Sequence, residues 1–150
     1  MSDPQWSFRA ARDTDRDFLF ALYATTMREL VVATWGWDEA WQREDFHRRF
    51  DSYRVRVIER QGLPIGAVFL EWLPNSIYLH EIQLLPAHQG AGIGSGLIRT
   101  LLTEAAGCGL SVSLSVVKAN VKAQKLYARL GFKVTGTDGP FVRMEHRISA

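Results

Sequence analysis

The sequence predicts a single domain, spanning residues 1–150, with a mixed α/β fold in which helices pack against one mixed sheet. Three observations support this. Alternating apolar residues between 53 and 85 are divided by two short turns, which indicates a meander of three antiparallel strands. A glycine-rich turn then leads into an amphipathic helix and another strand, a succession that implies a right-handed parallel crossover. Helical spacing of apolar residues marks one helix near the N-terminus and one after residue 120, and Asp38 is placed to cap a further helix after the first.

Composition and charge narrow the class of protein. The 150 residues are 47% hydrophobic and 23% charged, values typical of one globular domain. The net charge is +2, and no basic cluster alternates with aromatic residues, so we expect no nucleic-acid partner. No apolar run approaches the ~20 residues of a membrane span, and the first residues, MSDPQWSF, do not resemble a signal peptide. We therefore expect a soluble cytoplasmic protein. The sequence leaves its oligomeric state open, with a homodimer as one alternative.

Cysteine and histidine usage predicts neither a disulfide nor a metal site. Cys108 is the single cysteine, and the four histidines are too scattered for zinc-ligand spacing. We expect Cys108 to be a small buried hydrophobic residue near a helix end.

The N-terminal third predicts one strand and two helices. Residues 6–12 form the strand, and Thr14 with Asp17, at the spacing of a capping box, indicates a helix start. This helix ends near residues 34–37, and Asp38 caps a second helix that continues to about Phe50. The apolar face of the first helix contains Phe18, Leu19, Leu22, Tyr23, Met27, Leu30 and Val31.

Three of the five tryptophans, Trp35, Trp37 and Trp41, lie at the junction of these helices. Trp41 falls inside the second helix, where we expect core packing. For Trp35 and Trp37 two interpretations stay open, core packing and contact with a substrate.

A meander follows the helices. Residues 53–60 and 65–72 alternate as strands around a turn at 61–64, and a turn at 73–76 opens a third strand. That strand ends at Leu85, because Pro86 cannot donate to a sheet ladder.

The C-terminal third continues with a strand, a helix and a hairpin. Gly107 and Gly109 end the central helix, and residues 111–117 form a strand that should lie parallel to the one ending at Leu85. Asn120 caps the next helix, whose apolar face is Ala123, Leu126, Tyr127 and Leu130 and whose stop is Gly131-Phe132. Residues 133–137 and 141–148 form the hairpin.

The glycine-rich turn is a candidate anion site. Gly90, Gly92, Gly94 and Gly96 precede or open a helix, whose first amides lack intrahelical partners and can point at a phosphate. A P-loop would need lysine where Leu97 stands, and the Rossmann spacing also fails here. A tight turn with close helix packing is the alternative to an anion site.

Two motifs resemble those of the GNAT superfamily of N-acetyltransferases. Residues 89–94, Gln-Gly-Ala-Gly-Ile-Gly, resemble its Q/R-x-x-G-x-G/A loop, and residues 120–132 are similar to its N-x-x-A-x-x-x-Y-x-x-x-G-F pattern. The order of elements also resembles the family's fold over nearly the whole chain. The resemblance implies binding of acetyl-CoA, with its pyrophosphate on the loop.

The same resemblance implies a set of site residues. It implies that the two parallel strands splay apart beyond Leu85 and Val116, and that the pantetheine arm bonds the strand edge in the gap. A backbone amide of that strand polarises the thioester carbonyl, and Tyr127 protonates the departing thiolate. An aromatic residue in the buried helix face is the alternative reading of Tyr127. The implied cofactor-binding residues are Gln83, Leu84, Leu85, Gln89, Gly90, Ala91, Gly92, Ile93, Gly94, Ser95, Asn120 and Tyr127.

The chemistry also needs a base, because an alkyl amine with a pKa of about 10.4 is protonated at neutral pH. Glu81 is the candidate, since it interrupts the apolar alternation of Ile77 and Leu79. A carboxylate satisfied by a neighbouring arginine or amide is an equal alternative. His80, expected on the opposite strand face, is a reserve base, although a satisfied core histidine is the better interpretation.

The sequence therefore predicts direct transfer of the acetyl group to a primary amine of a small molecule or peptide, within a ternary complex. Cys108, at the far end of the central helix, is poorly placed as a nucleophile. Two alternatives stay open: a catalytically silent acyl-CoA-binding or sensing domain, and a protein acetyltransferase acting on N-termini or lysines. The glutamate and the tyrosine favour an enzyme.

Overall fold

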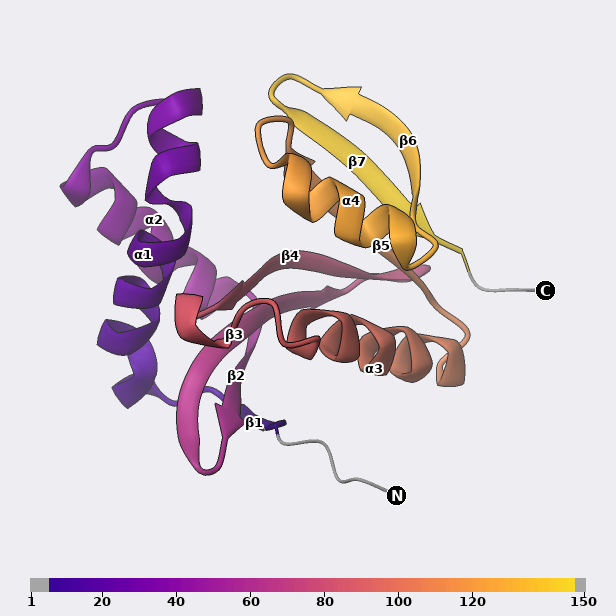
Figure 1. The fold of residues 1–150 in the computed structure, drawn as a ribbon, viewed down its shortest axis with the longest axis horizontal. Coiled ribbons are helices and arrows are strands. Elements are labelled where there is room, and N and C mark those ends of the chain that lie inside the picture. Colours follow the sequence, from indigo (N-terminus) through magenta and orange to yellow (C-terminus); the bar gives the residue numbers. More distant parts are fainter. Residues whose placement is uncertain (1–5, 148–150) are drawn as a thin grey trace.

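The computed structural model describes residues 6–147, which form one seven-stranded mixed sheet with helices on both faces (Figure 1). The spatial order of the strands is β1-β2-β3-β4-β5-β7-β6, and only β4 and β5 are parallel. The predicted order of elements is confirmed throughout. The strands are β1 (Trp6–Ala10), β2 (Arg54–Arg60), β3 (Leu63–Trp72), β4 (Ser76–Leu84), β5 (Ser111–Val117), β6 (Lys133–Asp138) and β7 (Phe141–His146), and the α-helices are α1 (Arg16–Thr34), α2 (Glu39–Ser52), α3 (Ile93–Gly107) and α4 (Val121–Arg129).

Two apolar clusters cover the two faces of the sheet. On one face α1 and α2 pack against β2 and β3, with Phe46 and Phe69 almost fully enclosed. On the other face α3 and α4 pack against β3, β4, β5 and β7, with Ile98 and Leu114 in the centre. The predicted helix faces are largely confirmed, although Phe20, buried at 4% exposure, was omitted from the α1 face.

The sheet opens between its two parallel strands. Pairing of β4 with β5 runs only from Ser76↔Ser111 to Leu79↔Leu114, and beyond those residues the strands diverge (Figure 1). We expected the opening beyond Leu85 and Val116, which places it several residues too late. The cause is that each strand keeps its other partner: β4 continues along β3, whereas β5 pairs with β7 as far as Val117. The gap is therefore long enough to be part of a binding site.

The start of α1 differs from the prediction. Thr14 and Asp17 form no capping box. Instead a short 3₁₀ turn, Asp13–Asp15, precedes the helix, and the Asp15 carboxylate accepts the Arg12 N–H at 2.7 Å. An aspartate that can bond the backbone three residues before it stabilises such a turn as well as a helix cap would.

The other predicted helix ends are confirmed. Asp38 accepts the Trp41 N–H at 3.0 Å at the start of α2, and Asn120 accepts the Ala123 N–H at 3.1 Å at the start of α4. At the end of α4 the Phe132 N–H donates to Tyr127 O and Gly131 adopts φ +98°, which is a Schellman motif.

Strand limits differ in several places. β1 ends at Ala10, where its pairing with β2 stops, rather than at Arg12, and β4 ends at Leu84 rather than at Leu85. The turn before β3 contains only Gln61 and Gly62, both with positive φ, so Leu63 and Pro64 belong to the strand rather than to the turn. β7 ends at His146, and Ile148, which we placed in that strand, lies outside the described residues, as does the chain start at residues 1–5.

Three sequence expectations concern membrane-spanning helices, metal ligands and the burial of Cys108. Within residues 6–147 no helix has the length and apolar character to cross a membrane. In the same range no three His, Cys, Asp or Glu side chains gather as metal ligands would. Cys108 is exposed, so the prediction that it is buried was wrong. The reason is that α3 ends at Gly107, and Cys108 therefore lies just outside the helix whose apolar face packs on the core.

Candidate functional site

A cavity of about 1290 Å³ lies where β4 and β5 separate. Its wall combines the loop before α3, the open ends of both strands, one side of α4 along its length, and the facing sides of α1 and α2. Motifs that are far apart in the sequence thus share one cavity. Of the predicted residues, those in the wall are Trp35, Trp37, Glu81, Gln83, Leu84, Gln89, Gly90, Gly92, Gly94, Ser95, Asn120 and Tyr127, together with the reserve base His80.

The glycine loop has the form of an anion cradle. Gly90 and Gly92 have φ of +77° and +78°, and a Cβ added at either would meet no atom within 4 Å. Close packing does not explain these two glycines, whereas the left-handed backbone does. Only Gly96 fits the close-packing alternative, because a Cβ there would lie 3.1 Å from Trp6.

The loop leaves backbone amides free for a ligand. The Gly96 N–H donates to Gly92 O at 3.0 Å and makes the first bond of α3, so the preceding amides have no acceptor within the helix. Two predicted members contribute no side chain to the cavity: Ile93 is buried in the core, and Ala91 is exposed outside the wall. Their amides remain part of the loop.

Gln89 ties this loop to the end of β4. Its Nε2 donates to Leu84 O at 2.9 Å, on the edge of β4 that faces the gap. The Leu85 N–H donates to Ile65 O at 2.8 Å and is therefore used within the sheet. Because successive residues of a strand point their backbone groups to opposite edges, Leu84 rather than Leu85 presents its N–H to the gap. Leu85 is also absent from the cavity wall.

A β-bulge reorients the candidate base. Phe69 pairs with Glu81 and Leu70 pairs with Leu79, so His80 is an extra residue on β4. The bulge shifts the side-chain alternation by one position. Leu79 packs with α3, but Glu81 lies on the other face, against α2. The predictions that Glu81 shares a face with Ile77 and Leu79, and that His80 opposes it, were wrong.

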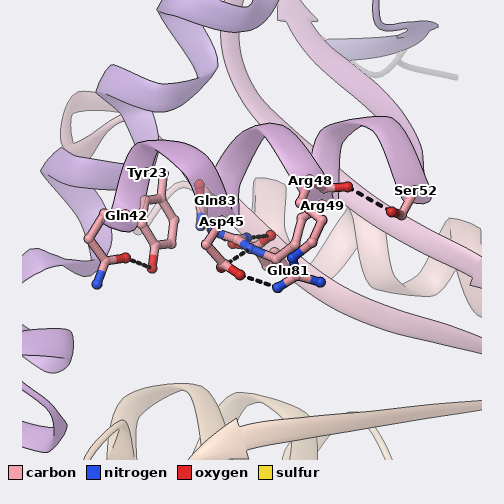
Figure 2. Close-up of polar contacts among 8 residues, drawn as sticks. All are labelled: Tyr23, Gln42, Asp45, Arg48, Arg49, Ser52, Glu81 and Gln83. Carbon is pink, nitrogen blue, oxygen red and sulfur yellow. Dashed lines mark hydrogen bonds and ion pairs between the residues drawn. The ribbon is translucent and has the colours of Figure 1, made fainter. Parts of the chain in front are cut away.

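Figure 2 shows the partners of Glu81. Its two oxygens accept hydrogen bonds from Arg49 Nη1 and, at 3.1 Å, from Gln83 Nε2. Arg49 Nε also donates to Asp45 at 2.8 Å. Burial raises the pKa of the Glu81 carboxyl, and Arg49 opposes that rise. These contacts agree with the alternative in which a neighbouring arginine or amide satisfies the Glu81 carboxylate. Each oxygen still keeps a lone pair for a ligand.

Sequence reasoning did not identify Arg49. The available signal was the Asp45–Arg49 spacing of four residues, which indicates an ion pair on one helix face. That spacing is common on exposed helices, and nothing local shows that this face of α2 turns toward β4. The Arg49 side chain retains only 14% of its surface exposed.

His80 has partners of its own. Its ring stacks on Tyr53, with centroids 3.7 Å apart, and its Nε2 lies 2.9 Å from a Glu71 oxygen. This arrangement agrees with the interpretation of a satisfied histidine.

Tyr127 occupies the cavity wall from the α4 side. Its ring is 6% exposed and packs against Phe132, with centroids 5.6 Å apart. Burial raises the pKa of its phenol to about 12, which keeps the hydroxyl protonated at neutral pH. The position of Tyr127 therefore agrees with both interpretations. Its ring belongs to the buried face of α4, and it also lines the cavity, where an acid would have to lie.

The three tryptophans all line the cavity, and the prediction for one of them was wrong. Trp41 is 58% exposed, so its expected place in the core was wrong, because the exposed side of α2 carries it. Trp35 is 56% exposed and contacts Phe141, with ring centroids 5.7 Å apart. Trp37 is partly buried and stacks on Tyr23.

A row of cations on α4 was also missed. Lys122, Lys125 and Arg129 line the cavity, and none forms an ion pair with any residue in the described range. Their spacing of three and four residues puts them on one side of the helix. Together with the loop amides they make this part of the wall favourable for an anion.

Comparison with protein families agrees with this geometry. Residues 16–132 match the model of the "Acetyltransferase (GNAT) family". An L-methionine sulfoximine/L-methionine sulfone acetyltransferase of Salmonella typhimurium is 34% identical over 99 residues, 59% of this chain and 55% of that protein. An L-amino acid N-acyltransferase of Escherichia coli is 33% identical over 99 residues, with the same coverage. The chain spans about half the length of these curated relatives.

Solved structures share the fold over nearly the whole chain. The PaiA N-acetyltransferase of Thermoplasma acidophilum, in complex with coenzyme A, superposes with a TM-score of 0.78 at 18% identity, covering 98% of this chain and 99% of that one. A spermidine N-acetyltransferase of Vibrio cholerae, in complex with CoA and spermine, has a TM-score of 0.68 at 26% identity, covering 95% of both chains. The predicted fold is confirmed by these likenesses.

Proposed function

The chain belongs to the acetyltransferase (GNAT) family, and from this premise we propose that it transfers the acetyl group of acetyl-CoA to a primary amine of a small molecule or peptide. In this proposal residues 1–150 form one catalytic domain that binds both substrates together. The observation that supports it best is the single cavity, which joins the glycine loop, the gap between β4 and β5, and the aromatic residues of α1 and α2.

The cofactor part of the cavity suits acetyl-CoA. The free amides that open α3 and the cations of α4 would hold its phosphates, and the free edge of β4 at Leu84 would bond the amide-bearing pantetheine arm. That arm would extend the thioester into the gap between the strands. A backbone N–H there would stabilise the negative charge that develops on the carbonyl oxygen.

The transfer itself removes two protons from the nitrogen and supplies one to the sulfur. Glu81, directly or through water, would take the first proton from the ammonium, and the free amine would attack the thioester carbonyl. The new C–N bond forms as the C–S bond breaks, the nitrogen gives its second proton to water, and Tyr127 would hydrogen-bond or protonate the departing thiolate. The raised pKa of the phenol makes full transfer to a thiol of pKa about 8.5 uphill, so a strong hydrogen bond is the main contribution expected.

Two measurements test the proposal separately. Calorimetric titration with acetyl-CoA measures cofactor binding, and release of the CoA thiol measures transfer to a panel of amino acids, polyamines and peptides. The panel covers the acceptors of the relatives, which include L-amino acids and spermidine. Binding with no transfer to any acceptor would favour an acyl-CoA sensor. No binding at saturating acetyl-CoA would overturn the proposal.

A further inference from the structure

Two buried side-chain donors in residues 6–147 have no hydrogen-bond partner, Trp37 Nε1 and Arg49 Nη2. A buried donor left unpaired costs free energy, so each of these two donors needs an explanation. Both residues line the same cavity. Both also pack on one residue, Tyr23: the Trp37 ring stacks at 5.9 Å between centroids, and Arg49 Cζ lies 4.8 Å from the Tyr23 ring centroid.

Neither donor makes a hydrogen bond of normal geometry, although the Tyr23 hydroxyl lies near the Arg49 guanidinium. The Tyr23 hydroxyl donates to Gln42 Oε1 at 3.2 Å, and the other nitrogens of Arg49 are taken by Asp45 and Glu81. The ring face of Tyr23 attracts the guanidinium, but it is a weaker acceptor than an oxygen. Trp37 and Arg49 both line the cavity, and the Arg49 side chain keeps 14% of its surface exposed, so a ligand that enters the cavity lies next to both side chains.

The chemistry of the two donors identifies their ligand. An indole N–H and a guanidinium N–H can only donate, so the ligand must offer acceptor oxygens, and the positive charge of Arg49 favours an anion. A ligand that is only an anion would be repelled by Asp45 and Glu81, which lie against the same guanidinium. An acceptor that carries an ammonium beside a carboxylate satisfies both conditions.

We infer that the acceptor is an α-amino acid whose carboxylate binds Trp37 Nε1 and Arg49 Nη2. This inference rests on the proposed acetyl transfer and specifies its substrate. Because Arg49 holds Glu81 through Nη1, a carboxylate on Nη2 places the α-amine, one carbon away, beside the Glu81 carboxylate. Met27, Val31, Trp35 and Phe141 also line the cavity, and these apolar residues suit an apolar side chain.

The test compares amino acids with amines that lack only the carboxylate. L-Methionine is paired with 3-(methylthio)propylamine, and L-phenylalanine with 2-phenylethylamine. The ratio of kcat/KM within each pair should favour the amino acid by roughly tenfold or more, the usual worth of hydrogen bonds to a charged group. In Trp37→Phe, which keeps an aromatic ring but loses the N–H, this ratio should fall by about tenfold.

Trp72→Phe is the matched control, because it changes a tryptophan of β3 that lies outside the cavity wall and whose indole nitrogen is not among the unpaired buried donors. It should leave the ratio unchanged. A general packing defect would lower both rates together and would not move the ratio. Arg49→Gln should also reduce the ratio, with an additional loss of turnover on both substrates because Glu81 loses its partner.

The outcomes separate this inference from the proposed function. A ratio near one in the unmodified protein, or a ratio that Trp37→Phe does not change, would overturn the inference. Acetylation of polyamines or simple amines without amino acids would overturn it as well, and would leave the acetyltransferase proposal intact. Failure of transfer to every amine would overturn both.

Discussion

Replacement of Tyr127 by phenylalanine separates a chemical role from a packing role. The ring would keep its place against Phe132, and the change removes only an oxygen whose pKa is raised by burial alone, with no bonding partner among the described residues. The free energy of unfolding should therefore change by no more than about 0.5 kcal/mol. For a chain of this size that corresponds to a shift of about 2 °C or less in Tm.

Turnover should respond very differently. Loss of a general acid, or of a strong hydrogen bond to the thiolate, typically lowers the rate by 10²-fold or more, which is about 2.7 kcal/mol or more in the activation free energy. The assay is release of the CoA thiol at saturating acetyl-CoA and amine, with cofactor affinity measured independently by calorimetry. We expect kcat to fall by about a hundredfold or more while acetyl-CoA binding is nearly unchanged.

Tyr78→Phe is the matched control, with the opposite expectation. The Tyr78 hydroxyl lies 2.6 Å from Ser115 Oγ, and Tyr78 is outside the cavity wall. Its loss should cost about 0.5–1.5 kcal/mol in stability and leave turnover within a few-fold of the unmodified protein. The acid role would be refuted if Tyr127→Phe kept full turnover with acetyl-CoA bound. It would also be refuted if the variant lost as much free energy of unfolding as it gained in activation free energy.

Three further predictions concern the base, the loop and an acid-sensitive ion pair. Glu81→Gln should lower the rate most near neutral pH and recover as pH rises toward the amine pKa, since the free amine then needs no base; an unaltered pH–rate profile would contradict the role. Gly92→Ala should weaken acetyl-CoA binding in calorimetry and cost about 1–2 kcal/mol of stability, because φ there is +78°; Gly107→Ala, where the added Cβ meets nothing and φ is not positive, is the control. The Arg9 guanidinium lowers the pKa of Asp15, so the charged form of Asp15 stabilises the fold above its ordinary pKa of 3.8. This stability should disappear as pH falls below about 4. Asp15→Asn should flatten that part of a Tm–pH curve.

Local signals were sufficient for most of the fold. Asn120 and Asp38 cap helices as predicted because a cap is a bond between residues three apart, which the sequence places together regardless of the rest. Gly90 and Gly92 have the positive φ that glycine permits at least cost. Where local signals compete, the prediction failed, as at Asp15, which replaced the expected pair of Thr14 and Asp17.

The candidate site was predicted less completely, since its walls come from separate elements. The motif residues of the loop and of α4 were identified because each motif is contiguous. Arg49 was missed, because its contact with Glu81 joins α2 to β4 across 32 positions. Trp41 was misplaced for a related reason: the side of α2 that faces the sheet depends on how the helix packs, and α2 has no continuous apolar stripe that would reveal it.

The sequence by itself determined the order of the elements, the glycine loop and the two motifs of the family, because periodicity, caps and backbone preferences act over a few residues. Only the tertiary structure decided the side on which Glu81 lies, since one extra residue at His80 reverses the alternation of β4. It also decided where the sheet opens. Beyond the point where β4 and β5 separate, β4 still pairs with β3 and β5 still pairs with β7. Both are properties of strand pairing, which is set by the whole sheet and not by either strand alone.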